Sequence, residues 1–527
     1  MSDDRSDVII VGSGLNSLVC AALLAKKGIK PLVLERNAVF GGCIRTEELF
    51  PGYQHELMAS WYPLFLGGGA YAKLKDDIAQ AGVEFIDNGY TTGVVLPDGR
   101  SLALKQDIAD AIQRLDGVAA GDGALIGAMA DEIFNKNGEL LFGLLGGSPY
   151  QFSTFKLLFQ QWRKRGIDQL MQFAGQALIP FRSWSQKHIN HSLTEALMAP
   201  WVLHSGLGPQ DAGSALIGKL TFAAVVGGGM PVVKGGGTQL VNALVSIIEK
   251  HGGKLLANTQ VDQIIVQNGK AVGVEAGQKT YMANKAVVCN VTPTQLYQHL
   301  LPNVAPEVTQ AADNYRYGRG AMQIHLALSS RPAWANEEML NVPLAHLATD
   351  LDQVSMSVMQ AECGLIPTQP TVAVGQPAAV DPSRVPDGGW IFWLQIQDMP
   401  RVLKGDAKGE IEVDATQGWT EQVREQVADR IVGQLENVLP GLSDQIIGRK
   451  VLSPTDLEQL NPNLVGGDIY SGTCSLDQFF WFRPFAKTGA VKGHQTPIKN
   501  VYHIGAATHP GPGLGGGSGL LVADLIK

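Results

Sequence analysis

The chain has 527 residues, of which 49 are acidic and 41 basic, and this net charge of −8 without a basic tail argues against a nucleic-acid-binding protein. Its five cysteines form no CxxC pair and no zinc-type spacing, which argues against a disulfide framework and predicts that the chain holds no metal. Glycine contributes 62 residues, well above the share of roughly 7% usual in proteins.

The N-terminal residues predict a strand, a helix and a second strand in quick succession. The apolar, β-branched run 7–11 is typical of a buried parallel strand, and the helix is expected over 17–27. Gly28 ends that helix, and residues 30–35 predict the next strand. Residues 1–7 are polar and lead straight into the first strand, so we find no signal peptide and expect a cytoplasmic protein.

The turn after the first strand has GxGxxG spacing, with serine in the third place. Gly12 permits the tight turn, Gly14 lets the backbone approach a pyrophosphate, and Ser17 is small enough for the helix to pack on the strand. The helix N-terminus would offer amide N–H groups to that anion. Glu35 would accept hydrogen bonds from both hydroxyls of an adenosine ribose, which favours FAD or NAD over NADP. The alternative is an ordinary turn in which the glycines occur by chance.

A second glycine motif follows this unit and carries a resemblance to a known family. From Glu35 to Thr46 the sequence reads ER-x4-GG-x2-RT, which resembles the FAD-binding signature of the amine oxidase and phytoene desaturase superfamily. The resemblance implies that FAD is the cofactor, that Gly41 and Gly42 pass close to it, and that an arginine pairs with its pyrophosphate. Residues 54–61 also resemble the stretch that runs beside the flavin ring in that superfamily.

Three later segments extend the resemblance. Residues 235–274 resemble the second FAD segment of the superfamily, and residues 501–521 resemble the C-terminal motif of phytoene desaturases and carotenoid ketolases. Residues 461–484 resemble a desaturase-like subgroup that contains those ketolases and pyridine nucleotide-disulfide oxidoreductase domain-containing protein 2. The turn and these resemblances together imply the following cofactor-binding residues: Gly12, Ser13, Gly14, Asn16, Ser17, Glu35, Arg36, Gly41, Gly42, Arg45, Thr46, Ala59, Ser60, Trp61, Val261, Asn290, Gly505, Ala506, Leu514, Gly515 and Gly516.

The predicted elements group into two domains. We expect an α/β fold in which a Rossmann-like FAD-binding domain is assembled from residues 1–75, 215–300 and 455–527. The two insertions, 76–214 and 301–454, would form an α+β substrate domain. The remaining elements are expected as helices at 239–250, 419–438 and 520–526 and as strands at 254–257, 260–266, 271–275, 286–289, 321–328, 390–397 and 501–504.

Segment 143–181 is aromatic and locally basic. Phe152, Phe155, Phe159 and Trp162 fall on one face of a predicted helix, close to a basic cluster at 163–165. An aromatic face beside basic residues is the composition of an interfacial helix. We interpret it as an apolar entrance for a lipid-like substrate or as a helix in peripheral contact with the inner face of a membrane; a core-facing helix is the alternative.

The sequence also narrows the redox chemistry. A flavin performs the redox step itself, so no catalytic triad is expected. A disulfide reductase needs a second cysteine beside Cys43, but position 48 is Glu48. No second strand–GxGxxG–helix unit is present for NAD(P)H, which favours dioxygen or a quinone as the electron acceptor. Strand 321–328 also lacks the lysine that amine oxidases of the superfamily often place near the flavin.

We therefore predict an FAD-dependent oxidoreductase that dehydrogenates, desaturates or oxygenates a hydrophobic (polyene, isoprenoid or lipid-like) substrate by hydride transfer to the flavin. A flavin amine oxidase and a non-catalytic interaction protein are the alternatives. Three polar side chains are candidates for catalysis: His509 in the predicted flavin-facing loop, His55 near the predicted flavin ring, and Arg483 after an aromatic run. Each has a structural alternative, namely packing for the histidines and a surface ion pair for the arginine.

Glycine clustering supports the cofactor prediction. The glycines at 12–14, 41–42, 235–237 and 505–519 all fall where the backbone is expected to approach FAD. A further cluster, Gly67–Gly69, coincides with no predicted contact and is interpreted as a hinge towards the substrate domain.

Overall fold

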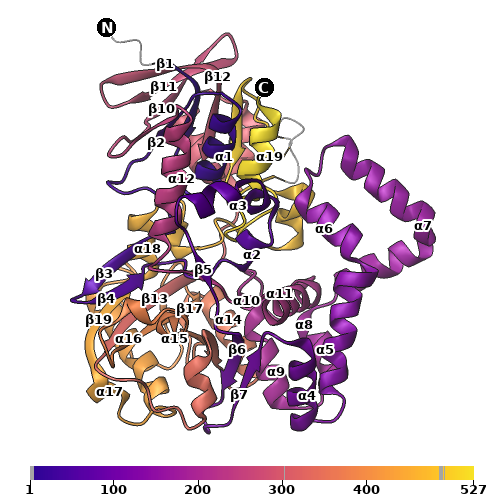
Figure 1. Ribbon diagram of the computed structural model, residues 1–527, viewed down its shortest axis with the longest axis vertical. Coiled ribbons are helices and arrows are strands. Elements are labelled where there is room, and N and C mark those ends of the chain that lie inside the picture. Colours follow the sequence, from indigo (N-terminus) through magenta and orange to yellow (C-terminus); the bar gives the residue numbers. More distant parts are fainter. Residues whose placement is uncertain (1–4, 302, 486–490, 492) are drawn as a thin grey trace.

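The computed structural model describes residues 5–301, 303–485, 491 and 493–527. Two large sheets lie towards opposite ends of an elongated molecule, each flanked by helices, and a helical arm projects from one side (Figure 1). Helices α1 (Leu15–Lys26) and α19 (Gly517–Leu525) come from distant parts of the sequence and pack together on the first sheet.

The first sheet combines strands from three separated segments of the chain. Its order is β10-β11-β12-β1-β2-β9, and β20 pairs in parallel with the C-terminal half of β12. The strands are β1 (Arg5–Val11), β2 (Pro31–Leu34), β9 (Lys254–Leu256), β10 (Gln263–Gln267), β11 (Lys270–Ala276), β12 (Lys279–Asn290) and β20 (Val501–Ile504). This parallel sheet with an antiparallel extension confirms the expected α/β, Rossmann-like fold, while the residue limits of the domains stay a prediction.

Both faces of the first sheet are covered, as the apolar run in β1 predicts. Val8 and Ile10 face α1, α19 and α12 (Thr238–Lys250), whereas Ile9 and Val11 face the opposite cluster, which includes α13 (Pro306–Asp313). Helix α19 begins three residues earlier than the predicted 520–526, because its first turn contains glycines that the sequence assigns to a loop.

The second sheet has the order β19-β13-β17-β16-β14-β6-β7 and is antiparallel except for the pair β14–β6. Helix α16 (Glu421–Glu436) packs on one face, and α9 (Ser192–Met198), α10 (Pro200–Leu203) and α11 (Ser214–Gly228) pack on the other. Its strands are β6 (Tyr90–Val95), β7 (Ser101–Lys105), β13 (Gly320–Leu328), β14 (Leu344–Leu347), β16 (Val372–Gly375), β17 (Trp390–Met399) and β19 (Ile446–Leu452).

Short elements connect the two sheets. They include β3 (Thr46–Phe50), β4 (Tyr53–Glu56), α2 (Pro63–Leu66), α3 (Gly69–Gln80) and α18 (Pro454–Leu460). The insertion after β7 contains α4 (Ile108–Val118), α5 (Asp122–Ala130) and α8 (Phe181–His188), and α14 (Leu351–Glu362) lies in the later insertion.

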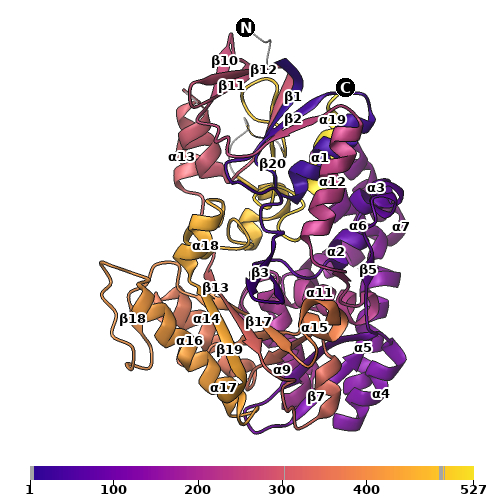
Figure 2. The same ribbon diagram turned by 60° about the vertical axis from the view of Figure 1, so that its left-hand side comes forward.

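The projecting arm consists of α6 (Gly138–Gly146) and α7 (Phe152–Ala177), and we call residues 138–177 the aromatic arm (Figures 1 and 2). Helix α7 bends at Gly166, whose φ of +78° is not helical. The predicted aromatic face is exposed, with 54% of Phe155 and 47% of Trp162 accessible, which contradicts the core-facing alternative. Within the described residues, no helix combines the length and hydropathy needed to cross a bilayer.

Candidate active site

A large cavity opens between the two sheets at the carboxyl ends of β1, β2 and β12. Its volume of about 1610 Å³ exceeds the roughly 300–1,000 Å³ of common ligand pockets, so a cofactor and a second molecule fit together. Open α/β sheets bind ligands at this edge. The predicted cofactor residues that line the cavity are Gly12, Ser13, Gly14, Asn16, Glu35, Arg36, Gly41, Gly42, Ala59, Ser60, Trp61, Val261, Asn290, Ala506, Leu514 and Gly515.

Two glycine turns meet at the nucleotide end of this cavity. A Cβ on Gly42 would lie 3.0 Å from the Cα of Gly14, so only glycine allows the turns to pass this closely. The Ser13 backbone N–H and hydroxyl donate to Glu35 Oε2 at 2.9 and 2.7 Å, and Asn37 N–H donates to Oε1 at 2.8 Å. A carboxylate has about four acceptor positions, so Glu35 retains capacity for ribose hydroxyls.

The other predicted cofactor residues lie behind the cavity wall. The Ser17 hydroxyl accepts a hydrogen bond of 2.9 Å from Asn290 Nδ2 and so ties α1 to the end of β12. Gly505 N–H donates to Ser518 Oγ at 2.9 Å, and Gly516 precedes α19 with a φ of +69°. Arg45 pairs with Glu47, while its buried Nε has no hydrogen-bond partner among the described residues.

A buried ionic network connects these turns to the second sheet's domain. Arg384 Nη1 lies 2.9 Å from Glu56 Oε1, and its Nε lies 3.1 Å from Asp381 Oδ2. Glu56 also accepts from Gly237 N–H at 2.7 Å and from the hydroxyl of Thr46, another predicted cofactor residue, at 2.9 Å. Desolvation has the largest effect on the pKa of Asp381 and raises it, but hydrogen bonds and Arg384 bring the pKa below its usual value.

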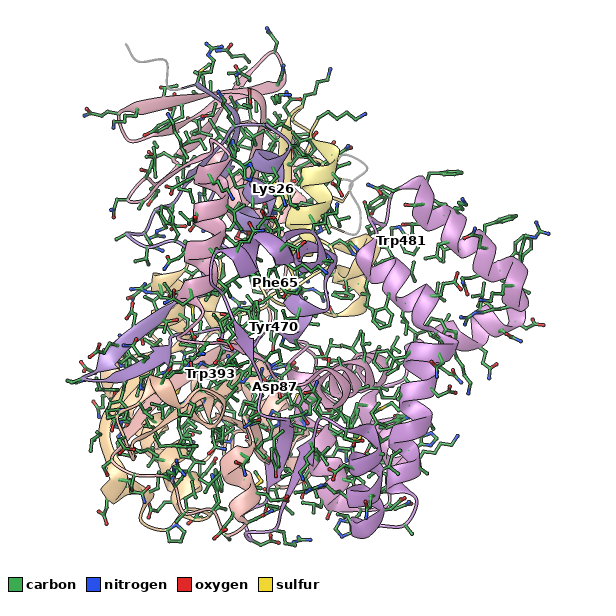
Figure 3. All side chains as sticks on the ribbon, in the orientation of Figure 1. Lys26, Phe65, Asp87, Trp393, Tyr470 and Trp481 are labelled. Atoms are coloured by element: carbon green, nitrogen blue, oxygen red, sulfur yellow. The ribbon has the colours of Figure 1, made fainter. Side chains whose placement is uncertain are left out.

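Three features near the predicted flavin ring fit FAD. Ser60 Oγ and Trp61 Nε1 are buried without partners among the described residues, although both residues line the cavity. The Trp61 ring meets the Trp393 ring edge to face at 4.9 Å, which forms an aromatic wall. Trp393, labelled in Figure 3, comes from β17 of the second sheet. Uncharged polar groups here and glycine turns at the nucleotide end are the environment that a flavin dinucleotide requires.

The remainder of the cavity wall is uncharged and largely apolar. Apart from Glu35 and Arg36 at the nucleotide end, no carboxylate, lysine or arginine lines the cavity in the described part of the chain. His204 also lines it, and burial lowers its pKa to about 3, so this ring is neutral at physiological pH.

The sequence reasoning missed several residues that line the cavity. Gly67–Gly69 lie in its wall, where a Cβ on Gly68 would come within 2.9 Å of the Leu64 carbonyl oxygen. The clustering of these three glycines was the sequence signal that could have predicted a contact with the cavity. The sequence contained no comparable signal for Trp393, Gln395 and Gln397, which reach the cavity through the pairing of the second sheet. The same holds for His204, which reaches it from the end of α10.

The three candidate catalytic residues lie outside the cavity lining. His509 is buried and packs edge to face on Phe480 at 5.3 Å, and burial lowers its pKa to about 4. His55 packs on His325 at 5.3 Å, and burial likewise lowers its pKa to about 3. Their catalytic roles stay predictions.

Arg483 is buried and fully engaged with backbone. It donates to the carbonyl oxygens of Tyr470 and Ala506 at 2.9 Å each and of Thr473 at 3.1 Å. The proposed alternative, a surface pair with a carboxylate, is therefore wrong. These bonds position the C-terminal loop that carries Ala506, a residue of the cavity wall.

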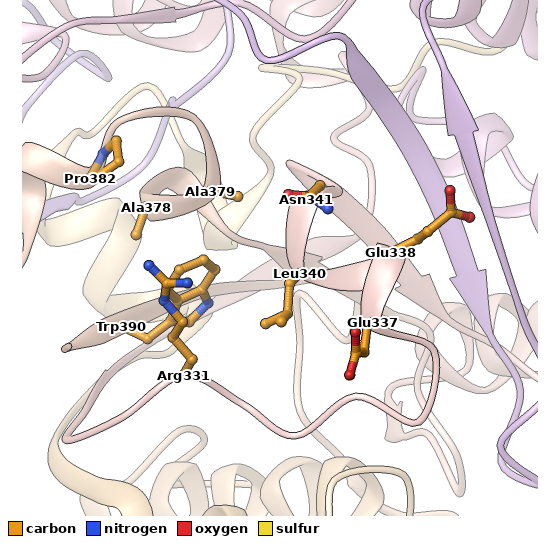
Figure 4. A pocket seen from close by; sticks show the side chains of 9 residues that line it. All are labelled: Arg331, Glu337, Glu338, Leu340, Asn341, Ala378, Ala379, Pro382 and Trp390. Carbon is orange, nitrogen blue, oxygen red and sulfur yellow. The ribbon is translucent and has the colours of Figure 1, made fainter.

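A second, shallower cavity of about 450 Å³ lies on the second sheet's domain (Figure 4). The Arg331 guanidinium lies over the Trp390 ring at 5.8 Å, and Glu337 and Asn341 complete part of the rim. None of the predicted site residues lines this cavity.

Comparison with known proteins agrees with this geometry. The model of the family described as flavin containing amine oxidoreductase matches residues 18–526. Pyridine nucleotide-disulfide oxidoreductase domain-containing protein 2 of Rattus norvegicus is 26% identical, covering 99% of this chain and 93% of the relative. A polypeptide of the limonene dehydrogenase of Castellaniella defragrans is 21% identical (99% and 94% covered), and phytoene desaturase of Fusarium fujikuroi is 22% identical (100% and 90%).

Solved structures show the same fold at low sequence identity. An oxidoreductase from Methanosarcina mazei superposes with a TM-score of 0.63 at 15% identity, covering 99% of this chain and 100% of the other. Putrescine oxidase bound to putrescine gives a TM-score of 0.59 at 13% identity, with 99% and 98% covered.

Proposed function

Because the chain belongs to the flavin containing amine oxidoreductase family and is an FAD-dependent oxidoreductase, we propose that it dehydrogenates, desaturates or oxygenates a hydrophobic substrate. Bound in the cavity, FAD would supply the hydride acceptor. The observation that carries the proposal is the uncharged, largely apolar cavity wall between Trp61 and α11. Such a wall stabilises apolar molecules and offers no counter-ion to a charged one.

The relatives support this substrate class. Two of them are named for phytoene and for limonene, which are hydrocarbons. A structural neighbour is named for putrescine, which is a diamine, so amine oxidation is the second candidate. An amine could pack against the aromatic wall formed by Trp61 and Trp393, but the wall beside it contains no carboxylate among the described residues.

Anaerobic reduction of the FAD-loaded protein tests the proposal. We expect bleaching of the flavin absorbance by at least one member of a panel of carotenoids, other polyenes and fatty acyl compounds, and no bleaching by amines. Reduction by amines alone would replace the proposal with amine oxidation. A purified protein that neither carries nor takes up flavin would instead support an interaction role. We propose dioxygen or a quinone as the electron acceptor. Mixing the substrate-reduced flavoprotein with each of them, and following the return of flavin absorbance, would identify which one reoxidises the flavin.

We further propose that the aromatic arm delivers the substrate from a membrane surface. Phe134, Phe142 and Leu145, before and within α6, line the large cavity, and Phe134 and Phe142 are also exposed, as is the aromatic face of the adjoining α7. Lys156 and Arg163 on α7 have no acidic partner among the described residues, whereas Lys164 pairs with Glu139 at 3.1 Å. An aromatic face with free cations favours anionic bilayers.

Liposome flotation tests the arm. Wild-type protein is expected to float with vesicles of phosphatidylcholine and phosphatidylserine, and the double variant Phe155→Ser/Trp162→Ser is expected to lose at least about tenfold of that binding, because two large apolar anchors are removed. The matched control is Met356→Ser/Met359→Ser, which changes two exposed apolar residues on α14. Wild-type recovery in the unbound fraction would disprove membrane contact.

A further inference from the structure

A row of hydrogen-bonded polar side chains crosses the second sheet at the largely apolar cavity, and three of its members, His204, Gln395 and Gln397, line the cavity wall. Its members lie on neighbouring strands of the second sheet and at the end of α10, and we call them the polar row: Gln323, Gln395, Gln397, His204 and His346. Gln323 on β13 stands opposite Gln395 on β17, and Ala373 separates Gln395 from His346 on β14. His204 bridges this gap, because its ring is hydrogen-bonded to both Gln397 and His346.

The hydrogen bonds in the polar row run outward from Gln397 in two directions, towards Gln323 and towards His346. Gln397 Nε2 donates to Gln395 Oε1 at 3.1 Å and to His204 Nδ1 at 3.2 Å, which uses both of its hydrogens. Because its Nδ1 accepts, the neutral His204 ring carries its proton on Nε2 and donates to His346 Nε2 at 2.8 Å. Gln395 Nε2 donates one hydrogen to Gln323 Oε1 at 3.4 Å.

Two hydrogen-bonding positions remain at the cavity. The second N–H of Gln395 has no acceptor, and Gln397 Oε1 has no donor, among the described residues, and both side chains line the cavity. The pair thus offers one donor and one acceptor on adjacent residues of the same strand face. Trp393, two residues earlier on β17, contacts Trp61, so the pair lies next to the predicted flavin wall.

From this geometry we propose that the substrate is an apolar alcohol, whose hydroxyl donates to Gln397 Oε1 and accepts from Gln395 Nε2. A pure hydrocarbon would leave the second N–H of Gln395 and the Oε1 of Gln397 without partners, and a ketone would leave Gln397 Oε1 without a donor. An ammonium or a carboxylate would find no opposite charge in the described part of this wall. The inference rests on the proposed function, because it specifies the substrate class of that same cavity.

Binding of saturated probes separates this inference from turnover. FAD-loaded protein is titrated anaerobically with 1-dodecanol, dodecane, dodecanoate and dodecylamine, delivered from cyclodextrin, and followed by tryptophan fluorescence. Gln397→Leu is expected to weaken 1-dodecanol binding about tenfold, the equivalent of one hydrogen bond, and to leave dodecane binding unchanged or stronger. Because each probe is compared between variants in the same medium, the effect of cyclodextrin on the free probe concentration is the same on both sides and cancels.

Two further variants complete the design. Gln395→Met removes the donor from a half-buried position and is expected to have the same selective effect, so it replaces Gln397→Leu if that variant loses FAD or its folded structure. Thr221→Val is the matched control, since Thr221 lines the cavity but its hydroxyl already donates to the Ile217 carbonyl at 2.9 Å. This variant is expected to change neither the affinity for 1-dodecanol nor that for dodecane.

Several results would overturn the inference. One is an equal loss of affinity for 1-dodecanol and for dodecane in both glutamine variants, and another is no loss of 1-dodecanol affinity in either variant. The inference would also fail if the wild type bound dodecanoate or dodecylamine more tightly than 1-dodecanol, or bound 1-dodecanol too weakly to measure. Failure of the proposed function has a different signature. In that case polyenes and lipids do not reduce the flavin, while the selective effect of Gln397→Leu on 1-dodecanol binding persists.

Discussion

Replacing Arg384 with methionine is expected to lower the free energy of unfolding by about 3–5 kcal/mol, a large fraction of the stability of most proteins. The guanidinium is completely buried, pairs with Glu56 and Asp381, and donates to the Val233 carbonyl at 2.7 Å. Methionine fills much of the space but leaves both carboxylates buried without their cation. Urea unfolding followed by tryptophan fluorescence measures the loss.

Two control variants show whether the loss of stability comes from the buried ion pairs. Lys234→Met breaks a solvent-exposed pair with Glu84 and is expected to cost less than about 1 kcal/mol. The double variant Arg384→Met/Glu56→Gln is expected to recover part of the loss, because one of the two stranded charges is removed. An Arg384→Met effect no larger than that of the exposed control would contradict the assignment of this network as a structural element between the cofactor turns and the second sheet's domain.

Substituting Gly519 with alanine is expected to reduce bound FAD at least about tenfold. A Cβ at this position would lie 2.0 Å from the backbone oxygen of Asn16, so α19 cannot keep its contact with the GxGxxG turn. Asn16 and neighbouring residues of α19 line the cavity, and their displacement opens the pyrophosphate and flavin region together. The ratio of flavin to protein absorbance after purification and desalting measures retention.

The control for this prediction is Gly433→Ala in the last turn of α16, where an added Cβ meets nothing within 4 Å. Alanine is expected there to stabilise slightly, since it favours helix more than glycine does, and to leave FAD content unchanged. Normal FAD content in Gly519→Ala would show that the helix can shift without opening the site.

The sequence predicted the cofactor end of the site better than the substrate end. The strand 7–11, the helix after Gly14 and the acidic Glu35 form one local unit, and short-range patterns specify such units well. Gln395 and Gln397 alternate with apolar residues along β17, which in isolation indicates a solvent-facing strand surface. Only the packing of α10 and α11 over that surface makes it the floor of a cavity.

Tertiary packing also determines that the face of the aromatic arm is exposed and that Arg384 and Arg483 are buried, and the sequence alone could not predict either. The helical spacing of Phe152, Phe155, Phe159 and Trp162 predicts a shared face, but a shared aromatic face occurs in cores as well as on surfaces. Arg384 and Arg483 belong to a residue type that is seldom fully buried, and nothing near them in sequence indicates the distant partners Glu56 and Ala506.

The contact between α1 and α19 has a consequence for synthesis of the protein. These helices lie about 500 residues apart in sequence, and strand β20 joins the first sheet equally late. At roughly 5–20 residues per second, the ribosome completes the GxGxxG turn long before the helix that packs on it exists. We therefore expect the N-terminal unit to keep part of its apolar face uncovered until the last residues are made, and the complete FAD site to form only after that.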